Sequence, residues 1–184
     1  MRIIGGELKG RRLQAGKGRA VRPTSGKIRE AIFDIIAPFL SDGVVLDLFA
    51  GTGGVGIEAL SRGMERAVFV EKSPGVVPIL KKNISACQLE RQAEVIARSV
   101  SNGIKTLCSR NDKFKLIFLD PPYQKNLLEG TLEQIDKANL LSKGGIVIAE
   151  HSDGERVGKG FGKLVGYDCR RYGHALLSFF TYLE

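Results

Sequence analysis

Between residues 44 and 150 the sequence alternates short apolar runs with segments of helical periodicity. The apolar runs are six or seven residues long, which is typical of strands buried in a sheet. The segments between them place apolar residues three or four positions apart, as in helices that pack one face on a sheet. Strands that alternate with helices in this way form a mostly parallel sheet with helices on both faces. The sequence therefore predicts an α/β fold.

The pattern gives approximate bounds for each element and divides the chain into two expected parts. The expected strands are residues 44–49, 66–71, 93–98, 115–120, 144–150, about 161–170 and about 175–183. The expected helices are residues 25–37, 54–63, 74–87, 100–109 and 127–141. Residues 2–20 contain five glycines among short polar and apolar groups, which favours a small β-hairpin. We expect a seven-stranded main domain at 25–184 and a hairpin arm at 1–24.

The charge of the chain is concentrated in its first 29 residues. This stretch holds nine basic side chains and one acid, so its net charge of +8 equals that of the whole chain, and the remaining residues are neutral. The basic residues are Arg2, Lys9, Arg11, Arg12, Lys17, Arg19, Arg22, Lys27 and Arg29. A basic arm on a neutral body indicates a polyanionic partner. A solvated basic face is the alternative.

Cysteine spacing and hydropathy limit the other classes of protein. The three cysteines, Cys87, Cys108 and Cys169, are widely spaced and form no CxxC pair, so they indicate neither a disulfide framework nor a zinc site. No apolar run approaches the roughly 18 residues that span a membrane. We therefore expect a soluble, cytoplasmic protein that uses no metal.

The stretch LDLFAGTGGVG, residues 46–56, places glycines at 51, 53 and 56 between the first expected strand and the next helix. Such a loop lets backbone N–H groups approach a ligand closely, and its G-x-G-x-x-G pattern fits a nicotinamide dinucleotide. Glu71 ends the second strand, twenty residues after Gly51, where a carboxylate binds ribose hydroxyls. Both features suit NAD and S-adenosylmethionine equally.

Two further stretches favour S-adenosylmethionine. Asp47 lies inside a buried strand, where an unpaired carboxylate costs several kcal/mol, and the ammonium group of a methionine would be a partner. Nearby loop amides are the alternative partner. The stretch DPPY, Asp120 to Tyr123, follows the fourth strand at the edge where open α/β sheets bind ligands. Its carboxylate and the Pro121 carbonyl can hold the N–H groups of an exocyclic amine, while Tyr123 stacks on the base.

These residues resemble a known family. VLDLFAGTGGVGIEAL, FVEKS and IFLDPPY are similar to the cofactor loop, ribose acid and amine-binding loop of class I S-adenosylmethionine methyltransferases, which have a Rossmann-like fold. MRIIGGELKGRRL, RPTSGKIREAIF and YGHALLSFF resemble the bacterial RsmD family in particular. The resemblance implies methyl transfer from S-adenosylmethionine to the N2 amine of a guanine in 16S ribosomal RNA.

The resemblance also implies three sets of site residues. The expected catalytic residues are Asp120, Pro121, Pro122 and Tyr123. The expected cofactor-binding residues are Asp47, Phe49, Gly51, Thr52, Gly53, Glu71, Lys72 and Ser99. The expected RNA-binding residues are Arg2, Lys9, Arg11, Arg12, Arg19, Arg22 and Arg29. Ser99 stands where the family usually has an acid that holds the adenine amine. Arg22, Thr24 and Arg29 either close the methionine end of the site or guide RNA, and a packed helix start with solvated arginines is the alternative.

Four other classes remain to be compared with this one. An adenine-N6 methyltransferase acting on DNA or RNA shares DPPY, although sequence-specific examples usually need extra length to read bases. A glutamine-N5 methyltransferase would normally have Asn in place of Asp120. An NAD-dependent oxidoreductase needs a proton donor, and only His151 and His174 are available. A non-catalytic RNA-binding module would not need Glu71 together with DPPY.

Overall fold

The computed structural model describes residues 1–16, 26–40, 42–122 and 127–183. The chain forms two compact units, Met1–Ser99 and Val100–Glu184, which are described in turn. The residues Arg19, Arg22, Thr24 and Tyr123, all expected at the site, lie outside the described ranges, as does the expected domain boundary. No helix within the described ranges is long and apolar enough to cross a membrane.

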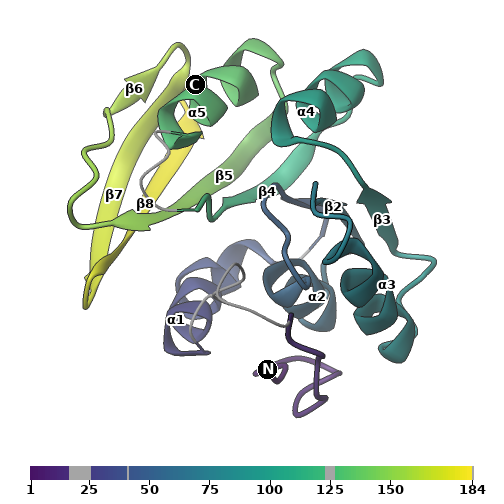
Figure 1. Cartoon of the computed structure of the whole chain (residues 1–184). Coiled ribbons are helices and arrows are strands. Elements are labelled where there is room, and N and C mark those ends of the chain that lie inside the picture. Colours follow the sequence, from purple (N-terminus) through teal and green to yellow (C-terminus); the bar gives the residue numbers. More distant parts are fainter. Residues whose placement is uncertain (17–25, 41, 123–126, 184) are drawn as a thin grey trace. The chain divides into compact units, whose positions relative to one another are not determined.

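The first unit contains a three-stranded parallel sheet with the order β3-β2-β1. Two of these strands, β2 and β3, are labelled in Figure 1. Its strands are β1 (Val44–Asp47), β2 (Arg66–Val70) and β3 (Ala93–Ile96). Its helices are α1 (Gly26–Ile36), the 3-10 helix η1 (Ala37–Phe39), α2 (Gly54–Ser61) and α3 (Val77–Ala86). Helix α2 connects β1 to β2 and α3 connects β2 to β3, as parallel pairing requires. The expected alternation of strands and helices is confirmed here.

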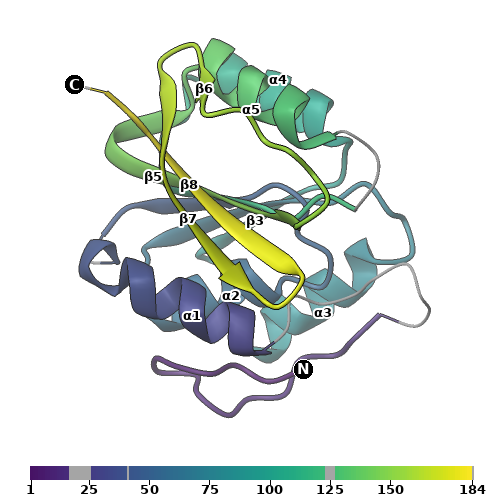
Figure 2. The same ribbon diagram turned by 90° about the vertical axis from the view of Figure 1, so that its left-hand side faces the viewer.

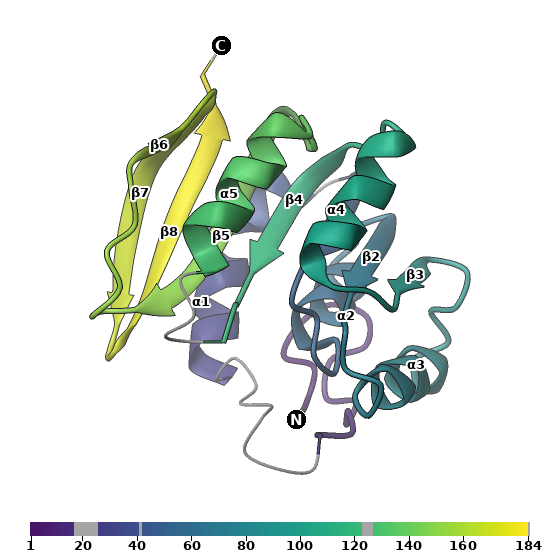
Figure 3. The ribbon, with the colours of Figure 1, turned by 45° about the horizontal axis from the view of Figure 1, so that its top comes forward.

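The second unit combines one parallel strand pair with an antiparallel group. Its elements are α4 (Val100–Ser109), β4 (Phe114–Leu119), α5 (Leu127–Lys137), β5 (Leu141–Ser152), β6 (Gly160–Phe161), β7 (Leu164–Tyr172) and β8 (Ala175–Tyr182). Strands β4 and β5 are parallel, and the order continues β5-β8-β7-β6 with antiparallel neighbours (Figure 3). Helices α4 and α5 lie side by side (Figure 2).

Most elements begin or end a few residues from the expected positions, and one strand was not expected. The described residues contain eight strands instead of seven, because Gly160 and Phe161 fold back on β7 as the short strand β6. Helix α3 begins three residues later than expected, because Val76 and Val77 both donate backbone hydrogen bonds to the Ser73 carbonyl in a turn. Helix α5 ends at Lys137, since the chain turns at Asn139 with a positive φ of 49° and enters β5 two residues later.

The first 14 residues, here called the N-terminal segment, form a loop closed by antiparallel backbone contacts. Arg2 and Arg12 form an isolated bridge, and Ile3 N–H donates to the Arg11 carbonyl at 3.0 Å. Within residues 1–16, the expected hairpin is represented by one antiparallel bridge without extended strands. Ile3 and Leu13 are 2% and 4% exposed, so the segment is packed on the unit and does not extend freely into solvent.

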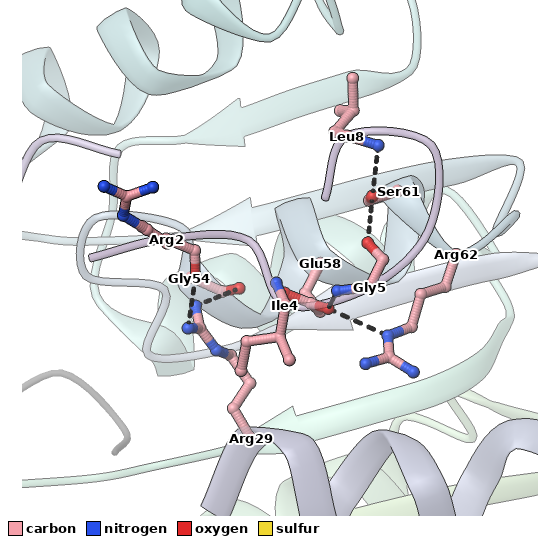
Figure 4. Close-up of polar contacts among 9 residues, drawn as sticks. All are labelled: Arg2, Ile4, Gly5, Leu8, Arg29, Gly54, Glu58, Ser61 and Arg62. Atoms are coloured by element: carbon pink, nitrogen blue, oxygen red, sulfur yellow. Dashed lines mark hydrogen bonds and ion pairs between the residues drawn. The ribbon is translucent and has the colours of Figure 1, made fainter. Parts of the chain in front are cut away.

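Two buried side chains of α2 hold the N-terminal segment (Figure 4). The Glu58 carboxylate, which has no exposed surface, accepts hydrogen bonds from Ile4 N–H at 2.8 Å and Gly5 N–H at 2.7 Å. The same carboxylate pairs with Arg62 Nε at 3.0 Å. Ser61 Oγ accepts from Leu8 N–H at 3.0 Å and donates to the Gly5 carbonyl at 2.6 Å. Backbone groups that have no sheet partner are thus satisfied by side chains.

We predict that Glu58→Ala lowers the free energy of unfolding by about 1–3 kcal/mol, because it leaves two amides without their charged acceptor. Hydrogen exchange at Ile4 and Gly5 should accelerate more than exchange in β2. The matched control is Glu65→Ala, since Glu65 is exposed and its removal should change stability by less than about 0.5 kcal/mol. Equal losses in both variants, measured by chemical denaturation, would contradict the anchoring role of Glu58.

Candidate active site

The glycine loop between β1 and α2 has a backbone that other residues would strain. Gly51 and Gly53 have positive φ values of 52° and 87°, a conformation that side chains disfavour. A Cβ atom on Gly56 would lie 2.3 Å from the Phe69 ring, so this glycine allows α2 to pack closely on β2. The first two glycines therefore shape the loop, and the third serves packing.

Glu71 follows β2 and binds the same loop. Its Oε2 accepts a hydrogen bond from Gly51 N–H at 2.9 Å, and its Oε1 accepts one from Ser73 N–H at 2.7 Å. A carboxylate has about four lone-pair sites, so each oxygen can accept one further hydrogen bond. Glu71 is only partly buried, and the remaining sites suit a pair of neighbouring hydroxyl groups such as those of a ribose.

Asp47 is buried at the end of β1, with 2% of its surface exposed. Its Oδ2 accepts a hydrogen bond from Gly56 N–H at 3.1 Å, so a loop amide is one of its partners, as in the alternative interpretation. Burial raises the pKa of Asp47 to about 7, and the nearby Glu71 carboxylate raises it further, against the lowering effect of the Gly56 hydrogen bond. A cation placed beside Asp47 would favour its ionised form.

The remaining expected cofactor-binding residues of the first unit differ in exposure. Thr52 is buried, and its carbonyl accepts a hydrogen bond from Asn83 Nδ2 at 2.8 Å. Phe49 is partly buried, whereas Lys72 and Ser99 are exposed. Hydrogen bonds of Gly51, Thr52 and Gly56 thus join the stretch of residues 46–56 to Glu71, Asn83 and Asp47, respectively.

The expected catalytic residues lie in the second unit. Asp120 follows directly after β4, whose last four residues are buried, and its side chain is partly buried. Pro121 is buried and Pro122 is exposed. A rigid strand followed by two prolines holds this carboxylate and the adjacent carbonyl at the carboxyl end of the strand.

The expected RNA-binding residues differ in accessibility. Arg2, Lys9, Arg11 and Arg12 are exposed on the N-terminal segment. Arg11 is partly engaged, because its Nη1 donates to the Ala86 carbonyl at 2.7 Å. These positions are compatible with a surface for a polyanion.

Arg29 requires a correction, because it is only 2% exposed and cannot form part of an RNA-binding surface. Its Nη2 donates to the Arg2 carbonyl at 2.7 Å, inside the unit (Figure 4). The charge of this residue suggested a surface role, but its position on the buried face of α1 gives it a structural one.

The roles of Glu58 and Asn83 were not predicted from the sequence. Glu58 sits among apolar residues of α2, and a carboxylate in such a helix signals a buried partner. Asn83 in α3 is 1% exposed and binds backbone groups far away in the sequence, which no local pattern reveals. Among the described residues, no group of three or more His, Cys, Asp or Glu is arranged to hold a metal ion.

The parallel strands, the glycine loop with its acid after β2 and the Asp-Pro-Pro sequence after β4 together define a Rossmann-like methyltransferase fold. Residues 1–181 match the family described as "Conserved hypothetical protein 95", and the chain belongs to this family. The expected resemblance to the RsmD family is thereby confirmed.

Several relatives carry names or have known structures. The chain is 39% identical to "Putative rRNA methyltransferase YlbH" of Bacillus subtilis, with 94% of each chain covered. It is 33% identical to "Ribosomal RNA small subunit methyltransferase D" of Escherichia coli, over 82% of this chain and 74% of the relative. The solved structure of "Putative methyltransferase yhhF from Escherichia coli" matches with a TM-score of 0.85 and 26% identity, over 99% of this chain and 97% of that one.

We predict that Asp47→Asn stabilises the protein at pH 8 relative to the parent and that this gain shrinks as the pH falls. The folded state keeps the Asp47 proton up to about pH 7, whereas an unfolded aspartate loses it near pH 4. The stability that the protonated group contributes is complete below about pH 4 and is lost as the pH rises to about 7. Chemical denaturation of both proteins between these limits measures the difference, and a difference independent of pH would contradict the raised pKa.

Proposed function

We propose that this protein transfers a methyl group from S-adenosylmethionine to the N2 amine of a guanine in 16S ribosomal RNA, in the cytoplasm. The observation that carries the proposal is the glycine loop bound to Glu71 in a chain that also has Asp120-Pro121-Pro122 after β4. The names of the Bacillus subtilis and Escherichia coli relatives support ribosomal RNA as the acceptor.

The first unit supplies groups that fit S-adenosylmethionine. The Glu71 oxygens retain acceptor sites for the ribose hydroxyls, and Asp47 offers a carboxylate whose ionised form an ammonium group would favour. The backbone at Gly51 and Gly53 has no side chains that would block a close approach. When bound, the cofactor supplies a methyl group on a positively charged sulfur, and the guanine amine attacks this methyl to leave S-adenosylhomocysteine.

Asp120 acts on the acceptor amine. The nitrogen lone pair of guanine N2 is delocalised into the ring, so the amine is a weak nucleophile until its N–H groups are held. The Asp120 carboxylate and the Pro121 carbonyl accept hydrogen bonds from these N–H groups. The carboxylate then stabilises the positive charge that appears on nitrogen as the new C–N bond forms, and the extra proton leaves to water or through Asp120. Tyr123 stacks on the guanine in this proposal.

The basic N-terminal segment holds the RNA. A target base must leave its stack to be modified, which costs a few kcal/mol, and contacts of Arg2, Lys9 and Arg12 with phosphates offset this cost. The residues Arg19 and Arg22 add to the same basic stretch. Ser99 takes the place of the acid that binds the adenine amine in relatives, and its hydroxyl can accept one hydrogen bond from it.

The direct test is a map of modified nucleosides in ribosomal RNA from cells that lack this protein. Mass spectrometry should find one guanine-N2 methyl group missing from 16S ribosomal RNA, and the purified protein with S-adenosylmethionine should restore it. Loss of an adenine-N6 methyl group instead would make the protein an adenine methyltransferase, and an unchanged map would overturn the proposal.

We predict that Asp120→Asn raises the barrier of the chemical step by about 2–4 kcal/mol while leaving cofactor affinity unchanged. The reason is that the carboxylate charge matters most when the amine becomes cationic. Single-turnover methylation and calorimetric titration measure the two quantities. Asp34→Asn, at an exposed position of α1, is the matched control and should react at the parent rate. A normal rate for Asp120→Asn would exclude the electrostatic role.

We predict that the double variant Lys9→Ala and Arg12→Ala flattens the salt dependence of RNA binding. Each phosphate contact releases roughly one counterion, so the slope of log affinity against log salt should fall by about one to two units. Lys105→Ala with Lys163→Ala removes the same charge from exposed positions in the second unit and should leave the slope unchanged. Equal slopes in the two double variants would mean that the N-terminal segment is only a solvated basic face.

A further inference from the structure

A buried side chain on α3 connects the N-terminal segment to the glycine loop. Asn83 Oδ1 accepts a hydrogen bond from Gln14 N–H at 2.7 Å, and Asn83 Nδ2 donates to the Gln14 carbonyl at 3.0 Å. The same Nδ2 also donates to the Thr52 carbonyl at 2.8 Å. One amide group, 1% exposed, therefore holds the end of the N-terminal segment and the middle of the loop together.

A second buried side chain makes the same kind of connection at the other end of the segment. Arg29 Nη2 donates to the Arg2 carbonyl at 2.7 Å, and Arg29 Nη1 donates to the Gly54 carbonyl at 3.4 Å (Figure 4). The side chain of Met1 also packs against this part of the loop, because a Cβ atom on Gly54 would lie 2.8 Å from Met1 Cε. Both ends of the N-terminal segment are thus tied to residues 52–54.

These hydrogen bonds couple a movement of the N-terminal segment to a movement of the glycine loop. If the N-terminal segment shifts, Asn83 loses its Gln14 partners and Arg29 loses the Arg2 carbonyl. Leaving such buried groups unsatisfied is costly, so the two side chains must reorient, and this disturbs the hydrogen bonds that they donate to the carbonyls of Thr52 and Gly54. A ligand that restrains the segment consequently restrains the loop as well. The second ligand then loses less conformational freedom on binding, which produces positive cooperativity.

We propose that Asn83 and Arg29 are positioning residues that couple RNA binding at the N-terminal segment to cofactor binding at the glycine loop. This inference rests on the proposed function, since it requires both ligands. Coupling of this kind is reciprocal, so RNA strengthens cofactor binding by the same factor by which the cofactor strengthens RNA binding.

The experiment measures this factor with S-adenosylhomocysteine, which permits binding without turnover, and a 16S ribosomal RNA transcript. Filter binding gives the RNA affinity with and without saturating S-adenosylhomocysteine, and calorimetry gives the reverse factor. The parent protein should show a factor of about five or more in both directions. Asn83→Ala should bring the factor close to one.

Ser61→Ala is the matched control because it separates coupling from simple anchoring. Ser61 holds Leu8 and Gly5 of the N-terminal segment, and within the described residues its side chain forms no hydrogen bond to the glycine loop, so its removal loosens the segment and spares the connection. It should keep the parent coupling factor even where RNA affinity falls. If Asn83→Ala does not fold, as judged by thermal unfolding, Arg29→Lys provides the second variant, because it keeps the charge but replaces two donor nitrogens with one.

Four results would overturn the inference. A parent protein that binds both ligands with a factor of one would exclude coupling while leaving the proposed function intact. An unchanged factor in a folded Asn83→Ala or Arg29→Lys protein would exclude these residues as its carriers, and an equal loss in Ser61→Ala would assign it to general anchoring. A parent protein that binds neither ligand would instead overturn the proposed function, and the inference with it.

Discussion

The backbone groups of the N-terminal segment and the glycine loop must find partners outside any regular sheet or helix, and side chains supply several of these partners. Glu58 accepts two amides of the segment, Asn83 and Arg29 donate to carbonyls of the segment and the loop, and Glu71 accepts the Gly51 amide. Each of these polar groups would be costly to bury alone. Because each is satisfied by the irregular backbone, the same contacts both allow the burial and fix the loop.

The charged side chains of the first unit are divided between its surface and its interior. The exposed cations of the N-terminal segment remain on the surface, whereas Glu58 compensates the charge of Arg62 inside the unit. Arg29 lies near the same carboxylate, which counteracts the lowering of its pKa by burial. Hydrogen bonds to its backbone therefore help to hold the segment, while the side chains of Arg2, Lys9 and Arg12 stay exposed at the surface.

Periodicity was sufficient to predict the order of elements from α1 to β5, because each strand is apolar and each helix has one apolar face. Periodicity was less accurate at the ends of elements, because backbone turns determine where a helix begins and ends. The Ser73 carbonyl delays the start of α3, and Asn139 shortens α5. The glycines, Asp47 and Glu71 were recognisable because their spacing is local. Asn83 and the true position of Arg29 were not, since their partners lie far away in the sequence.

Strand β6 is only two residues long, so it covers little of β7, and this affects the tendency of the protein to aggregate. It pairs only with Leu164 and Val165 of β7, so the rest of β7 forms the margin of its antiparallel group within the described residues. A long, flat, apolar margin of this kind would recruit strands from other molecules and start aggregation. Here the pairing register of β7 is irregular between Gly166 and Asp168, and Asp168, Arg170 and Arg171 place charges along the strand. These features disfavour the pairing of β7 with a strand of another molecule.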